Sequence, residues 1–462
     1  LDMIAMDDLS IITGLQIDVR VTTVKDVAQA LDRFYGNSEA MKVADQYTKE
    51  HQEKYGNSNK DKNADSEEIK QAPIVRLVNQ IIEQAVHKRA SDIHFEPMET
   101  QLRIRFRVDG VLQEAMRHDV SLLPAMVARI KIVGGMDISE KRKPQDGRMT
   151  SIVDRQEYDI RVSILPTVFG EKIVMRLTQK TALSRDKKDL GFKPDELTRF
   201  ESILKHPHGI MLVTGPTGSG KSTTLYTALS ELNTEGVNII TVEDPVEANI
   251  NGINQVQVNV KADMTFSAAL RSILRQDPDI IMIGEIRDNE TAEIATKAAI
   301  TGHLVVSTLH TNSAASTITR LADMGIEDYL IADSVIGVIA QRLVRRVCPK
   351  CKQMVPADML EKEELGVPAD QMEEELLIPR ATIGKEECLH CGGAGYKGRI
   401  GVYEIMTMSP DLKRIVAKGG SVEEIEKKAV EEGMKTLIMS ANELVKDGIT
   451  TIEEVHRVAY DD

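Results

Sequence analysis

The chain has 462 residues, of which 72 are acidic and 58 are basic, and its formal net charge at pH 7 is −14. This charge argues against nucleic acid or an anionic membrane as the main partner, and the length predicts roughly two to four domains. The most apolar run, residues 330–344, includes Asp333, Ser334, Gln341 and Arg342. We therefore expect a soluble protein without a membrane-spanning helix.

The N-terminal residues predict no complete domain. Residues 1–36 hold one short amphipathic pattern, which is too short to bury a core, and we expect them to be the C-terminal remnant of an N-terminal domain. Because the chain begins at Leu1, we also expect a fragment of a longer protein, and no signal peptide is visible. Residues 37–72 are rich in Lys, Glu, Asp, Asn and Gln, which predicts a flexible or partly helical linker.

Residues 73–180 predict a small α+β domain of PAS-like type. Its first residues place apolar side chains at helical spacing. Residues 102–108 then alternate between apolar and charged side chains, so that Arg103, Arg105 and Arg107 share one face of a strand. The remaining elements are expected to be a helix at 122–133 and strands at 149–153, 158–163 and 172–177.

Residues 190–347 predict a RecA-like ATPase core, because strands alternate with helices as in α/β domains that contain a parallel sheet. The expected strands are 210–214, 238–242, 280–283 and 304–308. The first strand leads directly into the pattern Gly-x-x-x-x-Gly-Lys-Ser and then into a helix-favouring segment. A phosphate-binding loop requires this context, so we predict a Mg²⁺-dependent ATPase.

The predicted phosphate-binding loop assigns roles to individual residues. Its glycines allow backbone N–H groups to approach phosphate oxygens, and the helix that follows adds positive charge at its N-terminus. Lys221 is placed to reach the β- and γ-phosphates of ATP, and the Ser222 hydroxyl is placed to bind Mg²⁺. The predicted nucleotide-binding residues are Gly215, Pro216, Thr217, Gly218, Ser219, Gly220, Lys221, Ser222 and Thr223.

Three polar residues follow the other strands of this sheet: Glu243, Glu285 and His310. Ligands of a parallel sheet collect at the carboxyl ends of its strands, and a P-loop hydrolase needs an acidic group near Mg²⁺ and a polar group that orients the attacking water. We assign water orientation to Glu285, support of the metal or its water shell to Glu243, and contact with the γ-phosphate to His310. Taken singly, each residue is alternatively a loop carboxylate, a helix cap or a structural histidine.

Gly284 departs from the usual P-loop pattern, in which this strand ends in an aspartate before the glutamate. A carboxylate expected near Mg²⁺ is therefore missing from this strand. Either Glu243 or Asp244 would supply it from the neighbouring strand.

The four cysteines form two pairs, Cys348-x-x-Cys351 and Cys388-x-x-Cys391. Each pair can grip a metal ion from a turn, and four thiolates make the closed tetrahedral set that structural Zn²⁺ prefers. The alternative is four ordinary thiols of an intracellular protein. We place a zinc-binding region at residues 348–400 and assign the metal no catalytic role, because a closed site leaves no open coordination position.

Residues 401–462 predict a helical C-terminal region. Ser421 and Thr451 begin patterns of the capping-box type, and Gly433 and Gly448 are suited to end helices.

With these motifs the chain resembles the secretion ATPase superfamily, which powers type IV pilus assembly and type II secretion, from about residue 73 to the C-terminus. Residues 215–222 match its P-loop, 241–247 its aspartate box, 279–288 its modified acidic motif and 301–312 its histidine box. A glycine in place of the expected aspartate occurs in that family too. The paired cysteines resemble those of the pilus-extension and type II secretion branches.

The resemblance implies a cytoplasmic homo-hexamer at the inner face of the bacterial inner membrane, with ATP, Mg²⁺ and Zn²⁺ as cofactors. Its partner would be an inner-membrane platform protein, so that membrane association arises through partners only and no nucleic acid is bound. On general similarity we favour pilus extension over type II secretion. A nucleic-acid motor of RecA type is the alternative from another class, but 9 Tyr, 7 Phe and no Trp offer little for base stacking.

The resemblance also places family arginines near the nucleotide in the strand that matches residues 102–108. Arg105 and Arg107 are therefore candidates to stabilise charge on the γ-phosphoryl group from a mobile neighbouring unit. The alternative is a solvated strand face. Arg271 and Arg275 are a second candidate pair, or simply one face of a helix.

Overall fold

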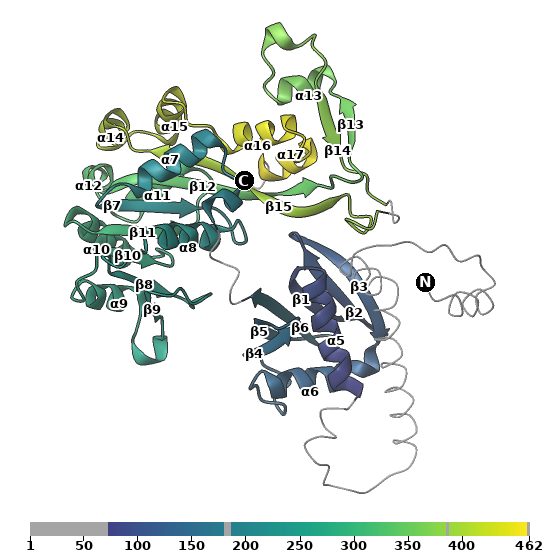
Figure 1. Ribbon diagram of the computed structural model, residues 1–462. Helices are drawn as coiled ribbons and strands as arrows, with labels where there is room; N and C mark the ends of the chain where they lie inside the picture. The colour runs from purple at the N-terminus through teal and green to yellow at the C-terminus, as the bar shows by residue number, and fades with distance from the viewer. Residues whose placement is uncertain (1–72, 180–185, 385–387, 460–462) are drawn as a thin grey trace, which may run out of the picture. The chain divides into compact units, whose positions relative to one another are not determined.

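The computed structural model describes residues 73–179, 186–384 and 388–459 (Figure 1). The predicted remnant 1–36 and linker 37–72 lie outside these residues. The described chain divides into two compact units, of which the first contains residues 73–149 with Ile160–Leu177. The second contains Thr150–Asp159 and the described residues from Thr178 onward.

The first unit, to which the β4–β5 turn region 150–159 is not assigned, is built on a sheet with two helices that pack together, α5 and α6. The strand order in the sheet is β3-β2-β1-β6-β5-β4. The elements are α5 (Pro73–His87), β1 (Ala90–Pro97), β2 (Gln101–Val108), β3 (Val111–Asp119), α6 (Leu123–Val133), β4 (Gln145–Val153), β5 (Gln156–Thr167) and β6 (Gly170–Gln179). This arrangement is the α+β domain that the sequence predicts.

The alternation predicted for β2 is present, because Leu102, Ile104 and Phe106 are buried and the arginines between them are partly exposed. Strand β1 was not predicted. Its polar face carries Asp92 and Glu96, and both are buried beside cations of neighbouring strands. Residues 92–96 do alternate between polar and apolar side chains, but the stretch is short, and the cations that pair with its buried carboxylates come from neighbouring strands that the segment itself does not reveal.

The second unit is built on a seven-stranded sheet of order β15-β12-β7-β11-β10-β8-β9. Its strands are β7 (Gly209–Thr214), β8 (Ile239–Glu243), β9 (Asn254–Gln257), β10 (Ile280–Ile283), β11 (Leu304–Leu309), β12 (Val335–Val347) and β15 (Tyr396–Thr407). All neighbours are parallel except β12 and β15, which are antiparallel. The four predicted strands are β7, β8, β10 and β11, which confirms the α/β class with a parallel sheet.

Helices cover both faces of this sheet. They are α7 (Pro194–Leu204), α8 (Lys221–Leu232), α9 (Phe266–Ile273), α10 (Asn289–Ile300), α11 (Ala314–Asp323), α12 (Asp328–Ser334), α14 (Pro410–Val416), α15 (Val422–Glu431), α16 (Leu437–Lys446) and α17 (Ile452–Ala459). The core on one face includes side chains of α7 and α8, and the core on the other includes α9 to α12 and the C-terminal helices. Successive strand residues alternate between the two cores, so the strands read as continuous apolar runs.

Residues 396–407 form a strand, although the predicted boundary between the cysteine region and the helical region falls within them. Strand β15 lies beside β12 along nearly its whole length (Figure 1). Residues Val402–Met406 are all buried, with Glu404 among them. Because the run contains a charge and has no period of two, its partner strand is needed to recognise it.

The C-terminal helices follow the predicted pattern in part. Ser421 forms a capping box at the start of α15, and Gly433 and Gly448 have positive φ after α15 and α16. The carboxylate of Glu454 does not cap α17, because it accepts instead from the backbone and side chain of Arg345. The described part of the chain contains no helix with both the length and the apolar character needed to span a membrane.

An excursion leaves the sheet between β12 and β15. It consists of the strand pair β13 (Gln353–Pro356) and β14 (Leu377–Arg380) and the short helix α13 (Met359–Glu364). The two cysteine pairs stand at its beginning and its end.

Candidate functional site

The predicted phosphate-binding loop joins β7 to α8, and its shape requires glycine. Gly215, Gly218 and Gly220 have φ values of 143°, 82° and 91°, which residues with a Cβ rarely adopt. A Cβ at Gly215 would lie 2.4 Å from the carbonyl oxygen of Gln341 on β12, and one at Gly220 would lie 2.8 Å from the Gln341 amide nitrogen. The loop is therefore pressed against β12.

The start of α8 provides donors for an anion. Helix α8 begins at Lys221, and its N-cap Gly220 has no side chain to cap the N–H groups of the first turn. The Ser219 hydroxyl beside it is buried and has no hydrogen-bond partner among the described residues. Unpaired donors and the positive end of the helix dipole fit the phosphates of a nucleotide.

Lys221 lies over this loop. Its Nζ donates to the carbonyl oxygens of Gly215 (2.6 Å) and Pro216 (3.1 Å). Burial lowers the pKa of Lys221 to about 8, although the nearby carboxylates of Glu285 and Glu247 act in the opposite direction. A phosphate group at the loop would favour the charged ammonium.

The carboxylate beside Ser222 is that of Glu247. The Ser222 hydroxyl donates to Glu247 Oε1 at 3.3 Å, whereas the sequence pattern predicts Glu243 at this place. Asp244, the other carboxylate predicted as a candidate, is exposed. Glu247 follows β8 in the same acidic segment, but its position depends on the turn through Pro245, which sequence spacing does not reveal.

Glu243 is buried within a hydrogen-bond network, with 4% of its surface exposed. Its carboxylate accepts from the Tyr226 hydroxyl, from Thr241 Oγ1 (2.6 Å) and from Gln255 Nε2 (3.1 Å). Tyr226 Oη also accepts from the backbone N–H of Glu247 at 3.2 Å. Glu243 thus holds Tyr226, and Tyr226 holds the segment that brings Glu247 to Ser222.

Glu285 and His310 lie together, as the strand ends predicted. Glu285 pairs with Arg287, and its second oxygen is 3.5 Å from His310 Nε2. Burial is the main cause that lowers the pKa of His310, and the positive charge of Lys221 adds to it. Lys221, Glu285 and His310 therefore form one electrostatic cluster, and Arg287 is a member that sequence reasoning missed.

Gly284 stands where the backbone of β8 leaves little room. A Cβ at this position would lie 3.3 Å from the Glu243 Cα atom and 3.3 Å from the Val242 carbonyl oxygen. An aspartate side chain would be pressed against the neighbouring strand. This crowding is a physical reason for glycine at the position.

Two buried polar residues of β12, Gln341 and Arg342, also reach this site. Gln341 accepts from Thr224 Oγ1 on α8 at 2.7 Å. Arg342 donates to the side chain of Asn312, which follows His310, at 3.2 Å. In the sequence these residues are evident only as polar interruptions of an apolar run. Polar residues in an otherwise buried strand were the signal that could have identified them.

Arg105 and Arg107 belong to the first unit, and their side chains are engaged there. Arg105 forms a bidentate pair with the buried Glu96, through Nε at 2.8 Å and Nη2 at 2.7 Å. Burial raises the pKa of Glu96, but the bonds from Arg105 and Lys172 outweigh this and lower it to about 2. Arg107 Nε is 3.7 Å from Asp92 Oδ2, and the Arg107 side chain is more exposed than that of Arg105. The arginine face is therefore an ion-pair network and not simply a solvated surface.

Arg271 lies on α9 and Arg275 lies in the turn that follows it, and both make local contacts. Arg271 pairs with Glu290, and Arg275 donates to the Arg271 carbonyl oxygen at 2.7 Å. Both residues are exposed; the position of Arg271 agrees with the helix-face alternative, whereas Arg275 lies just beyond the helix.

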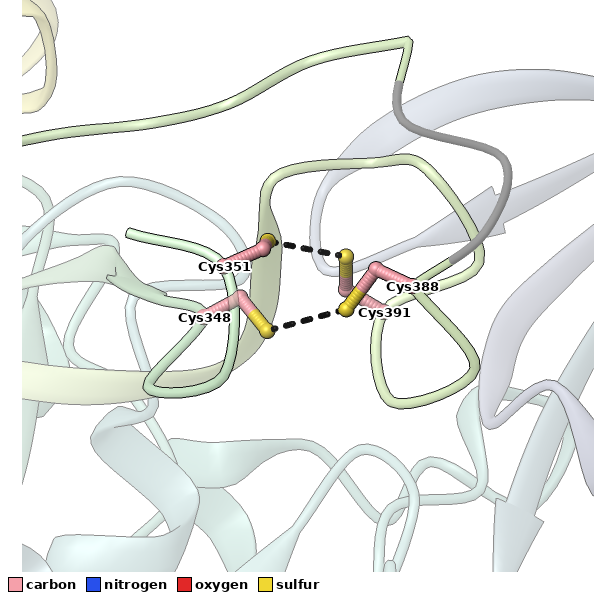
Figure 2. A group of neighbouring side chains, drawn as sticks. All are labelled: Cys348, Cys351, Cys388 and Cys391. Carbon is pink, nitrogen blue, oxygen red and sulfur yellow. Dashed lines mark hydrogen bonds between the residues drawn. The ribbon is translucent and has the colours of Figure 1, made fainter. Parts of the chain in front are cut away.

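The four cysteines converge into one cluster. Their Sγ atoms all lie within 4.8 Å of one another, and Figure 2 shows the two pairs facing each other, with Cys348 3.8 Å from Cys388 and Cys351 3.6 Å from Cys391. A tetrahedral zinc site with Zn–S bonds of about 2.3 Å places its sulfurs about 3.8 Å apart. The pairs meet because β12 and β15 are antiparallel neighbours.

The thiols also have partners that favour metal binding. The backbone N–H of Cys391 is the main cause that lowers the pKa of the Cys388 thiol to about 6, and a thiolate is the metal-binding form. Burial raises the pKa of Cys348 and Cys351. His390 Nδ1 is 3.4 Å from Cys348 Sγ, so one imidazole stands beside the cluster. All four cysteines are free thiols, and the set fits Zn²⁺.

Comparison with known proteins gives a family match over most of the chain. Residues 67–457 match the family described as "Type II/IV secretion system protein". The type IV pilus assembly ATPase PilB of Myxococcus xanthus is 47% identical over 466 residues, which cover 98% of this chain and 80% of that protein. The type II secretion system protein E of Xanthomonas campestris is 46% identical over 462 residues, which cover 100% of this chain and 80% of that protein.

Solved structures share the fold. The ATPase DotB of Legionella pneumophila has a TM-score of 0.61 at 21% identity, with 84% of this chain and 96% of that chain covered. The pilus retraction motor PilT with bound ADP has a TM-score of 0.54 at 24% identity, with 83% of this chain and 97% of that chain covered.

Proposed function

The chain belongs to the type II/IV secretion system protein family, which confirms the resemblance, and from this premise we propose that it is the ATPase that drives extension of type IV pili. It is an ATPase of a pilus or secretion machine. The observation that carries its chemistry is the cluster of Lys221, Glu285 and His310 at the phosphate-binding loop, which brings residues of the P-loop, the modified acidic motif and the histidine box into one site.

In the proposed reaction the N–H groups at the start of α8 and the ammonium of Lys221 bind the phosphates of ATP. Mg²⁺ would neutralise part of the phosphate charge, and the side chains of Ser222 and Glu247 are suited to hold it. Glu243 supports this arrangement through its hydrogen bond with Tyr226. Glu285 orients the attacking water with its carboxylate. His310 contacts the γ-phosphate and, with Arg287, holds the glutamate carboxylate in place.

We further propose a homo-hexamer in the cytoplasm, at the inner face of the inner membrane, that acts on a platform protein. ATP is a cytoplasmic substrate, and the known relatives are named for machines of the cell envelope. A nucleic-acid motor is disfavoured, because the charge of −14 would repel phosphate backbones.

Pilus extension and type II secretion are separated by a genetic test. Identity to relatives of the two branches is nearly equal, at 47% and 46%. Deletion of the gene in its host should remove surface pili and leave the set of secreted enzymes unchanged, as measured by electron microscopy and by analysis of culture medium. Normal pili with loss of secreted enzymes would assign the protein to type II secretion instead.

The arginine face of β2 gives a biochemical prediction. Arg105→Ala and Arg107→Ala should bind ATP but hydrolyse it at least about tenfold more slowly, because a guanidinium stabilises the charge on the γ-phosphoryl group in the transition state. A tenfold fall corresponds to a loss of about 1.4 kcal/mol of this stabilisation. Arg105→Ala should also lower stability, since Glu96 loses its bidentate partner. Turnover, nucleotide affinity and thermal unfolding measure these effects.

The matched control is Arg117→Ala, which removes an exposed arginine paired with Glu114 on β3. It should hydrolyse ATP at the parent rate. Mixing Arg107→Ala subunits with Glu285→Gln subunits should restore activity if the arginine acts across a subunit boundary. Full activity of both β2 variants would show that these arginines only hold the buried carboxylates.

The cysteine cluster predicts about one Zn²⁺ per chain, measured by elemental analysis of protein purified without chelator. Cys388→Ser should lose the metal and expose residues 348–391 to proteolysis, because the ion closes a long excursion between β12 and β15. Nucleotide binding should remain. His390→Ala is the control, and it should keep its zinc if four thiolates suffice. Zinc-free protein would contradict the site.

A further inference from the structure

Glu404 is a buried carboxylate that accepts hydrogen bonds from the starts of two helices. It lies on β15 with 2% of its surface exposed. Its Oε1 accepts from the backbone N–H of Ala314 at 2.7 Å, and its Oε2 accepts from that of Leu437 at 3.2 Å. These are the first residues of α11 and α16. One side chain thus joins two segments that are remote in sequence.

Neither helix needs this carboxylate for its ordinary cap. Ser313 caps α11 by accepting from Ser316, and Thr436 caps α16 by accepting from Met439. Glu404 satisfies a further donor at each helix, where negative charge is favourable. Burial opposes the charge and raises the pKa of Glu404 to about 7, although the two backbone bonds act against this rise.

Helix α11 starts directly after the loop that carries His310 and Asn312. The front of this loop is held by Thr214, the last residue of β7, whose hydroxyl accepts from the Thr311 N–H at 2.9 Å. The middle is held by Arg342, which donates to Asn312. The Glu404 contact to Ala314 holds its far end. The loop beside the phosphate site therefore has three polar anchors, and Glu404 is the one that also reaches the C-terminal helices.

We propose that Glu404 is a positioning residue for ATP hydrolysis, which fixes the loop of His310 and Asn312 through the N–H of Ala314 and ties it to the start of α16. This inference rests on the proposed ATPase function. Its consequence is that α16, through Leu437, belongs to the same hydrogen-bonded unit as the nucleotide site. Helix α16 is further fixed to β15 by the bond from Ser440 to the Tyr403 carbonyl oxygen at 2.7 Å.

The first test is Glu404→Gln, which keeps the shape but has only one acceptor oxygen, so that one of the two N–H groups loses its partner. We expect kcat to fall about tenfold, with KM and the affinity for a fluorescent ADP analogue unchanged within about twofold. A carboxylate that only stabilises the fold would lower the unfolding temperature and leave kcat of the folded protein unchanged.

The matched control is Glu196→Gln. Glu196 is also a buried carboxylate and accepts from a backbone N–H, that of Lys193 at 2.8 Å, at the start of α7. It also bonds to Ser440 of α16, but it makes no contact with the loop of His310 among the bonds described for it. Its glutamine variant should be destabilised to a similar degree and retain the parent kcat.

A second variant removes the donor instead of the acceptor. Proline is tolerated at the first position of a helix, and Ser313 has the extended conformation that can precede it, with φ −136° and ψ 168°. Ala314→Pro should lower kcat as Glu404→Gln does, and the double variant should show no further fall. The proposal would be overturned if the falls in kcat of the two single variants multiplied in the double variant. A parent-like kcat in Glu404→Gln would also overturn it.

Amide exchange in the unaltered protein provides a test that needs no variant. A non-hydrolysable ATP analogue should slow exchange at the amides of Ala314 and Leu437 together, by at least about threefold. Slower exchange at Ala314 alone would overturn the coupling to α16. If the unaltered protein hydrolyses no ATP, the proposed function fails, whereas hydrolysis with an unaffected Glu404→Gln variant refutes only the positioning role.

Discussion

Replacing Lys221 with alanine is expected to abolish nucleotide binding and ATP hydrolysis together, with a fall in kcat/KM of at least about a hundredfold, or roughly 2.7 kcal/mol. The ammonium is half-buried and donates to the carbonyl oxygens of Gly215 and Pro216, so it stands over the loop that would receive the phosphates. Alanine removes the cation that offsets the charge of the β- and γ-phosphates. Binding of a fluorescent ATP analogue and steady-state turnover measure both losses.

The control for this experiment is Lys261→Ala, which removes an exposed lysine of the same unit. It should bind and hydrolyse ATP as the parent does. The expected loss has a structural cause confined to the loop, so Lys221→Ala should unfold at nearly the parent temperature. A Lys221→Ala protein that binds the analogue with parent affinity would show that the phosphates bind elsewhere.

Glu285→Gln is expected to keep ATP binding and to lower kcat by at least about a hundredfold. Glutamine preserves the shape beside Arg287 and His310 but lacks the negative charge that orients the attacking water. It also loses the ionic pairing to Arg287, so single-turnover measurements with saturating ATP are needed to separate chemistry from binding. The expected pattern is a normal dissociation constant for ATP with a slow hydrolytic step.

Glu293→Gln is a suitable comparison for this variant. Glu293 lies on α10 and pairs with Lys297 on the helix surface, so its loss should leave turnover unchanged. Near-parent turnover by Glu285→Gln would remove the proposed role from Glu285. Glu243, the candidate named from the sequence, and Glu247, the carboxylate beside Ser222, would then be compared as its replacements.

Features that depend on a continuous segment could be predicted from the sequence. The phosphate-binding loop needs glycines at fixed spacing between a buried strand and a helix, and all of these conditions are local. The arginine face of β2 follows from a period of two. The clustering of Glu285 and His310 was also predictable, because carboxyl ends of parallel strands share one edge of a sheet. The cysteine cluster was predictable from the two Cys-x-x-Cys pairs, provided that the two pairs lie close together in the fold.

Tertiary structure decided which of several similar groups reaches the site. Glu243 and Glu247 are both acidic residues after β8, but the Tyr226 hydroxyl holds the first and the turn brings the second to Ser222. Gln341 and Arg342 reach the loop only because β12 lies beside β7.

The identification of β15 had the same cause, since its run of buried residues has no period and its antiparallel partner is far away in sequence. Glu404 acquired its role in the same way. An isolated strand does not specify which backbone N–H groups a charged side chain will meet, because the register and the packing of α11 and α16 set those distances. Local patterns therefore determined the chemistry of this protein, and long-range packing determined which residues take part in it.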